Sequence, residues 1–413
     1  MKQNKHSIFN DIPDEQKSGV VFKNHQFKKK IIRLLDKKGA ATINDISKKF
    51  NSSSPKVNKL IQELIDEGLI EDLGKAETDV GRRPHLYGLI GDSMYFLGVD
   101  LGHNSIEIGL MDFNENPIHF SKDIEFNLEN SEKSLLQLCD IINHFIDQNP
   151  DWRNKIVRIG VNLSGRVNHL SGYSHNFFNF TKTPLSSILE EKIGIPCFIE
   201  NDTRARAFYE FYSHKSKDSG NILYINADYG LGLGVLAQGK LLYGKSGYAG
   251  EFGHIPFFDN EIICICGKKG CLETEVSGRA LEKQFKDKLK EGQSSSLQHS
   301  FENLDNIRMD DIIKAANNDD TLSIELIGIM AEKLGKGITT LIHLYNPELI
   351  IFGGALAKSK DHFFLPLQMT VNKYSLSIVR ADTQLELSKG DEGAGVLGAC
   401  YLAKHKVLNP NPS

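Results

Sequence analysis

Three short amphipathic patterns follow one another near the start of the chain, and each predicts a helix. The first begins at Phe27 and places its apolar residues on one helical face. In the second, Thr42 precedes Asp45 at the spacing of a capping box, in which each side chain binds the other residue's backbone amide. The third is predicted to begin with Ser54 as N-cap and Pro55 in its first turn. Its apolar stripe consists of Val57, Leu60, Ile61, Leu64 and Ile65.

Two extended segments, 69–73 and 85–90, follow the third helix and are joined by a basic loop that reads GKAETDVGRRP. Three helices and a two-stranded ribbon are the order of a winged helix-turn-helix, which we predict over residues 23–91. The start of the third helix offers backbone amides to DNA phosphates, and an arginine pair at the loop tip suits a minor groove. The alternative is a small protein-interaction module with a solvated basic face. The candidate DNA-contact residues are Ser53, Ser54, Lys56, Asn58, Lys59, Arg82 and Arg83.

The distribution of charge separates this first part from the rest of the 413-residue chain. Residues 1–90 contain 17 Lys and Arg against 12 Asp and Glu, whereas the remainder contains 32 against 41. A basic module on an acidic body favours a polyanionic partner for the first part only, although chance surface charge gives the same counts. Within this part, residues 1–22 are polar and aperiodic and predict a flexible arm.

From Tyr95 onward, predicted strands alternate with predicted helices, the pattern of an α/β fold. A second group of strands begins at 222–225 and continues into the glycine-rich sequence DYGLGLGVLAQGKLLYG. A long amphipathic helix is predicted over 322–344. The other predicted strands are 95–99, 106–111, 118–126, 156–163, 196–200 and 348–352, and further helices are predicted over 135–146 and from 393 to 403.

The sharpest local signal is the sequence GEFGHIPFFDNEIICICGKKGCLE. His254, Cys264, Cys266 and Cys271 offer one imidazole and three thiols, a complete tetrahedral set for zinc. Four protein ligands leave no open coordination position, so such a zinc would be structural. The alternative is three ordinary core cysteines, which their clustering among lysines and glycines disfavours. Six cysteines in the whole chain do not resemble a disulfide framework, and they fit a reducing compartment.

Carboxylates and an amide gather near the ends of predicted elements. Glu200, Asn201 and Asp202 end a predicted strand, and Glu251 and Glu273 bracket the cysteine-rich loop. Sugar hydroxyls both donate and accept hydrogen bonds, so converging Asp, Glu and Asn side chains suit a polyhydroxylated ligand. The alternative is that these acids are solvated on the surface, as most are.

Because of these motifs, the chain resembles the ROK family, whose name joins repressors, open reading frames and sugar kinases. The resemblance covers about residues 24–405 and is closest to the branch with a DNA-binding head, such as the xylose and N-acetylglucosamine repressors. It rests on the cysteine-rich loop and on IENDTRARA, AGEFGH and NPELIIFGGALA, which occur in the family's order. It implies an actin-like, two-lobed sugar-kinase fold, with a small lobe over 94–213 and 391–405 and a large lobe over 214–390 that carries the zinc loop.

The resemblance also implies a set of sugar-binding residues. His254 would face zinc through one ring nitrogen and sugar through the other, and Asp202 matches the base of the family's kinases. Ser164 replaces the proline of the family's Pro-Gly sugar loop. The implied ligand-binding residues are Gly165, Asn201, Asp202, Glu251, His254 and Glu273.

Two departures from the kinase pattern concern the phosphate loops. The first loop reads DLGHNS, so His103 and Asn104 stand where ROK kinases have a glycine and a hydroxyl residue. The second reads ADYGLG, so Asp228 is expected to face the phosphates of ATP and repel them. Arg204 and Arg206 occupy a stretch that usually holds small residues.

Taken together, the sequence predicts a cytoplasmic, sugar-responsive repressor of carbohydrate metabolism genes that does not phosphorylate its sugar. Its expected partners are a double-stranded DNA operator, a sugar or sugar derivative bound between the two lobes, and a second copy of the chain, with pairing into tetramers left open. No membrane span or signal peptide is predicted. The alternatives are an active ATP-dependent sugar kinase with an appended head, and a repressor controlled by a sugar-transport protein.

Overall fold

The computed structural model describes residues 19–76, 83–213, 220–299, 303–390 and 393–409, and these form two compact units. The first unit takes the described residues of Met1–Leu163, Gly172–Ile199 and Ala399–Ser413. The second takes those of Ser164–Ser171 and Glu200–Gly398. No helix within the described residues is long and apolar enough to cross a membrane.

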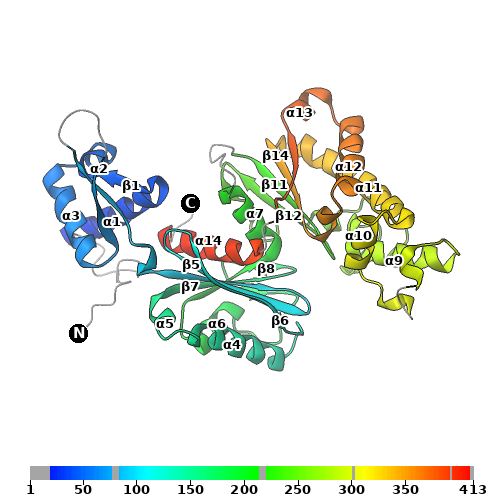
Figure 1. The fold of residues 1–413 in the computed structure, drawn as a ribbon, viewed down its shortest axis with the longest axis horizontal. Coiled ribbons are helices and arrows are strands. Elements are labelled where there is room, and N and C mark those ends of the chain that lie inside the picture. Colours follow the sequence, from blue (N-terminus) through cyan, green and yellow to red (C-terminus); the bar gives the residue numbers. More distant parts are fainter. Residues whose placement is uncertain (1–18, 77–82, 214–219, 300–302, 391–392, 410–413) are drawn as a thin grey trace. The chain divides into compact units, whose positions relative to one another are not determined.

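The predicted winged helix-turn-helix forms one end of the first unit. It has three helices, α1 (Gly19–Lys38), α2 (Ile43–Phe50) and α3 (Ser54–Asp66), drawn in blue in Figure 1. Its sheet has three strands in the order β1-β3-β2, where β1 is Ala40–Thr42, β2 is Ile70–Lys75 and β3 is His85–Leu89. The predicted two-stranded ribbon is present as the antiparallel pair of β2 and β3, and β1, which was not predicted, adds a third strand by pairing with β3.

Local capping explains where α2 begins. The capping box at the start of α2 is confirmed, since Thr42 and Asp45 bind each other's backbone amides at 3.1 Å. The N-cap of α3 is Ser53 and not Ser54, one residue earlier than predicted. α1 begins at Gly19, so residues 19–22, which were predicted to belong to a flexible arm over 1–22, are helical. Residues 1–18 of that arm lie outside the described residues.

The rest of the first unit is a five-stranded sheet in the order β10-β7-β4-β5-β6. In Figure 1, α14 (Ala394–Leu408) lies on one face, and α4 (Glu132–Asp147) and α6 (Leu185–Ile193) cover the other. β4 runs to Leu101, past its predicted end at Val99, because Asp100 and Leu101 continue the pairing with β5. The strands are β4 (Tyr95–Leu101), β5 (Ser105–Asp112), β6 (Pro117–Glu125), β7 (Ile156–Leu163) and β10 (Cys197–Asn201).

The head and α14 are joined within the first unit by polar contacts. The Arg33 guanidinium of α1 donates to the backbone carbonyl of Leu408 at 2.7 Å. Lys404 of α14 is 3 % exposed, and its ammonium binds the carboxylates of Asp36 and Glu115, the latter at 2.7 Å. The first helix of the head is thus tied to the last helix of the chain.

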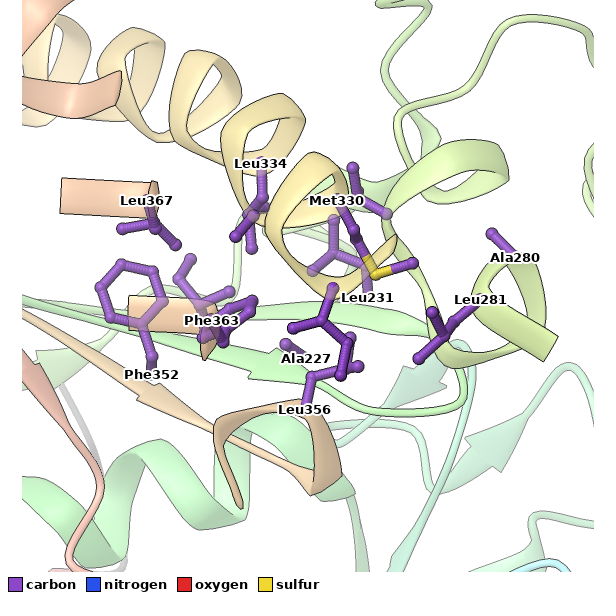
Figure 2. Close-up of a cluster of buried hydrophobic side chains, with 14 of the residues drawn as sticks. Ala227, Leu231, Ala280, Leu281, Met330, Leu334, Phe352, Leu356, Phe363 and Leu367 are labelled. Atoms are coloured by element: carbon purple, nitrogen blue, oxygen red, sulfur yellow. The ribbon is translucent and has the colours of Figure 1, made fainter. Parts of the chain in front are cut away.

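The second unit is built on a five-stranded sheet in the order β13-β12-β11-β14-β15. One face packs against α11 (Thr321–Tyr345) and α12 (Asp361–Tyr374), and Figure 2 shows the fully buried Phe352, Phe363 and Leu367 in this core. The strands are β11 (Ile222–Ala227), β12 (Leu231–Ala237), β13 (Lys240–Leu241), β14 (Leu349–Gly353) and β15 (Gln384–Leu387). The smaller helices are α8 (Glu273–Val276), α9 (Gly278–Lys290), α10 (Met309–Ala316) and α13 (Ser377–Ala381).

α7 (Asp202–Ser213) packs on β11 and β12, which is why it belongs to the second unit. A Cβ built on Gly234 of β12 would lie 2.4 Å from the Cβ of Ala207, so the helix approaches the strand closely. The units consequently divide at 199/200 and 398/399, whereas the lobes implied by the resemblance divide at 213/214 and 390/391.

Candidate functional site

The four predicted metal ligands come together in the second unit. The Nδ1 of His254 lies 3.4 Å from the Sγ of Cys264, and the Sγ atoms of Cys266 and Cys271 are 3.6 Å apart. All four ligand atoms lie within 4.8 Å of one another. Zinc bonds of 2.0–2.3 Å in a tetrahedron require ligand atoms about 3.3–3.8 Å apart. Both pairs named above have this spacing, and one imidazole with three thiols is a ligand set that zinc takes, so the residues could hold a structural zinc.

The loop that carries the thiols is folded by its own backbone. Cys264 donates its N–H to the carbonyl of Lys268 at 2.7 Å, and Gly267 donates back to the carbonyl of Cys264 at 2.9 Å. Gly270 has φ +69°, and a Cβ there would lie 2.1 Å from the carbonyl oxygen of Phe258. The glycines therefore allow the tight reversal that places three thiols beside the imidazole.

His254 connects this thiol cluster to one of the predicted sugar carboxylates. While its Nδ1 faces Cys264, its Nε2 lies 3.8 Å from an oxygen of Glu251. Glu273 is buried, and its carboxylate accepts the N–H of Leu231 at 3.1 Å. Its other oxygen lies 3.9 Å from the Sγ of Cys264, so this carboxylate also borders the cluster.

The start of α7 groups three other predicted sugar residues. Asn201 donates its side-chain amide to the carbonyl of Gly165 at 3.1 Å and to the carboxylate of Asp202 at 3.0 Å. The same Asp202 oxygen accepts the N–H of Thr203 at 2.7 Å. Gly165 has φ +87°, the left-handed conformation that glycine adopts without strain.

Arg166 joins these two groups, because its Nε lies 3.5 Å from the carboxylate of Glu251 and it directly follows Gly165. The second unit thus holds all six predicted sugar residues in one connected set of contacts. The set carries carboxylate and amide groups at the end of β10, at the start of α7 and beside the thiol cluster, which is the chemistry that a sugar requires.

The two loops that correspond to the family's phosphate loops make hydrogen bonds within the chain. In the first unit, the carbonyls of His103 and Asn104 accept the N–H groups of Leu128 and Phe126 at 3.0 and 3.2 Å. In the second unit, the carboxylate of Asp228 accepts the N–H of Tyr229 at 2.7 Å.

Asp228 also reaches across to a distant turn. Its second oxygen accepts the N–H of Ala355 at 3.2 Å. Backbone amides in glycine turns commonly bind anions, so this carboxylate takes a donor that an anionic ligand would use. The sequence indicated repulsion of phosphate at this position but gave no sign of this amide contact.

The predicted DNA-contact residues on α3 are exposed to solvent. Lys56 has its ammonium 5.3 Å from the ring centroid of Phe27, a cation–π contact that holds the side chain beside α1. Arg83 is exposed, whereas Arg82 lies outside the described residues. The exposed members on and just before α3 are Ser53, Ser54, Lys56, Asn58 and Lys59.

One buried residue in the second unit was noted in the sequence without a role. Arg204 is 5 % exposed and binds the fully buried Glu200 at 2.7 Å. The spacing of four residues between opposite charges in the motif IENDTRARA was the available signal.

Comparison with known proteins identifies the family of this chain. The model of the ROK family matches residues 96–406, and a model of winged helix-turn-helix DNA-binding domains matches residues 25–71. The chain belongs to the ROK family. It is 32 % identical over 398 residues to the xylose repressor of Caldicellulosiruptor bescii, covering 94 % of this chain and 98 % of that protein.

Solved ROK structures agree with this assignment. A ROK family transcriptional regulator described as a homologue of the E. coli MLC protein has a TM-score of 0.79 and 27 % identity, covering 92 % of this chain and 96 % of that one. A ROK glucokinase from Streptomyces griseus, in complex with glucose and AMPPNP, has a TM-score of 0.66 and 25 % identity, covering 75 % and 99 %. The actin-like sugar-kinase fold and the winged head are therefore confirmed. Because the family includes both repressors and kinases, membership alone does not decide between them.

Proposed function

We propose that this protein is a cytoplasmic repressor that binds a DNA operator through its winged head and releases or retains it in response to a sugar. The sugar binds the connected set of residues in the second unit, and it is not phosphorylated. The observation that carries the proposal is the contrast within that unit. The polar groups suited to a sugar are retained, while Asp228 already occupies a turn amide that a nucleotide phosphate would need.

The roles of the site residues follow from their contacts. Asn201 and Asp202 present an amide and a carboxylate at the start of α7, and Glu251 adds a second carboxylate beside His254. Asp202 hydrogen-bonds a sugar hydroxyl without needing to act as a base. Glu273 adds a buried carboxylate that the N–H of Leu231 holds in place.

The thiol cluster would hold one structural zinc. His254, Cys264, Cys266 and Cys271 would be its ligands, and the ion supplies folding energy to the loop. Holding the Nδ1 of His254 on the metal side fixes the ring with its Nε2 toward Glu251. The zinc thereby orders part of the sugar site without taking part in chemistry.

The head would contact DNA with the exposed residues of α3, with Arg83 and with Arg82 on the wing. A homodimer presents two recognition helices to two half-sites of an operator, which is the arrangement that winged helix-turn-helix proteins generally use. The sugar changes DNA affinity only to the extent that it binds the DNA-competent and DNA-incompetent states unequally.

The decisive experiment combines calorimetry with an ATP-dependent activity assay. Calorimetry with D-xylose, D-glucose and N-acetyl-D-glucosamine identifies the tightest ligand, and a coupled assay then follows ADP release with that sugar, ATP and Mg²⁺. We expect binding that Asp202→Ala and Glu251→Ala abolish, and no turnover. Turnover of about 1 per second or more, lost in Asp202→Asn, would instead establish a kinase with a DNA-binding head.

A further inference from the structure

Arg204 joins three separate segments of the second unit through one buried guanidinium. Its Nε binds the carboxylate of Glu200 at 2.7 Å. Its two terminal nitrogens donate to the carbonyls of Gly247 at 2.8 Å and Val167 at 3.1 Å. The arginine is 5 % exposed, so it makes these three contacts away from water.

The two carbonyls belong to loops that carry proposed sugar residues. Val167 lies two residues after Gly165, and Gly247 lies four residues before Glu251. The loops touch directly, because a Cβ on Gly247 would lie 2.8 Å from the carbonyl oxygen of Val167. Arg204 itself is two residues beyond Asp202 on α7. The guanidinium therefore fixes both loops relative to the start of that helix.

Aromatic side chains complete the surroundings of this guanidinium. Tyr243 donates its hydroxyl to the second oxygen of Glu200 at 3.1 Å, and its ring centroid lies 5.4 Å from the guanidinium carbon of Arg204. His169, from the same loop as Val167, stacks on the Tyr243 ring at 3.6 Å. Burial is the main reason that the pKa of Tyr243 is raised well above its usual value, and the Glu200 carboxylate adds to it, so the hydroxyl stays protonated as a donor.

We propose that Arg204 is a positioning residue for the sugar site, which sets the separation of the Gly165 and Glu251 loops. This inference rests on the proposed function, because it assigns those loops to sugar binding. A planar guanidinium can serve a carboxylate and two carbonyls at once, whereas a lysine ammonium carries the charge on a single nitrogen. Arg204→Lys therefore keeps the ion pair with Glu200 but cannot span both loop carbonyls.

The test compares sugar affinity with stability in matched variants. Arg204→Lys should stay folded with a lowered urea midpoint, because a buried carbonyl loses its donor, and should weaken the best of the three sugars at least tenfold in calorimetry. If Arg204→Met alone unfolds the chain, the double variant Arg204→Met with Glu200→Gln takes its place, because it removes both charges and leaves no unpaired ion. It should also fold and bind the sugar at least tenfold more weakly.

Hydrogen exchange supplies a second readout that does not depend on the sugar. In Arg204→Lys, amides of residues 165–169 and 244–250 should exchange at least tenfold faster, while those of β11 and β14 keep their protection. Arg153→Lys is the control, because Arg153 also donates to a carboxylate and to a main-chain carbonyl, that of Ile193 at 2.9 Å, but in the first unit.

The outcomes separate this inference from the proposed function. Sugar affinity within twofold of wild type in a folded Arg204→Lys variant, or unchanged exchange in both loops, overturns the positioning role. The same loss of affinity in Arg153→Lys would overturn it as well. If the wild-type protein binds none of the three sugars while the loops still loosen in Arg204→Lys, the sugar function fails and the guanidinium only maintains the loops.

Discussion

Removing two positive charges from α3 should weaken DNA binding by an amount that the salt dependence reveals. Lys56 and Lys59 are exposed on the helix that the winged fold presents to a groove. Each lysine–phosphate contact contributes about 0.9 to the slope of log affinity against log salt concentration. Lys56→Ala with Lys59→Ala should therefore flatten the slope by about 1.8 per head. At ~0.1 M salt, the corresponding loss of affinity is on the order of 60-fold per head.

The two lysines should also differ in their effect on folding. Lys56 contacts the Phe27 ring, so Lys56→Ala should lower the free energy of unfolding by about 0.5–1 kcal/mol, whereas Lys59→Ala should leave it unchanged. Fluorescence anisotropy on a duplex of random sequence between 50 and 300 mM salt measures the electrostatic contribution without knowledge of the operator. Lys283→Ala with Lys290→Ala, exposed on α9 in the second unit, makes the same change in net charge. An unchanged slope in the α3 variant, or an equal change in this control, would refute the assignment of this face to DNA.

Three further predictions concern metal content and stability. Elemental analysis should find one zinc per chain in the wild type and in Cys197→Ser, which lies outside the cluster, and none in Cys266→Ser. Burial would raise the pKa of Asp320, but hydrogen bonds from neighbouring serines outweigh it and lower the pKa to about 2. Asp320→Asn should thus cost about 2.5 kcal/mol of unfolding free energy at pH 7, a difference that shrinks as pH falls from about 4 toward 2 in urea titrations. Lys404→Met leaves two partly exposed carboxylates without their buried cation and should cost about 2–3 kcal/mol, against no measurable cost for Lys290→Met.

Features that depend on neighbouring residues were predictable from the sequence. The capping box of Thr42 and Asp45 and the ligand set from His254 to Cys271 are encoded within short segments, so residue type and spacing suffice. The strand β1 was missed because three residues carry no periodicity. Its partner β3 lies more than forty residues away, and no local signal indicates that pairing.

The features that the sequence did not predict are contacts between segments far apart in the chain. Asp228 meets the N–H of Ala355 across 127 positions, which explains why its charge was read from the sequence and its hydrogen bond was not. Arg204 binds carbonyls 37 and 43 positions away, and any residue type can supply a carbonyl. A backbone acceptor leaves no trace in the side-chain pattern, so the role of this arginine emerges only from the folded chain.

The contact between α1 and α14 has a consequence for the order in which the chain is made. The head is synthesised first, yet the contacts of Asp36 with Lys404 and of Arg33 with Leu408 can form only when the last helix has followed, more than 360 residues later. At elongation rates of ~5–20 residues per second, this interval lasts on the order of 20–70 seconds. During that time the head exists without these two contacts to the last helix. A foreign head placed on this chain would likewise need an acidic and a basic side chain at these two positions of its first helix, because Lys404 and the Leu408 carbonyl stay in the last helix.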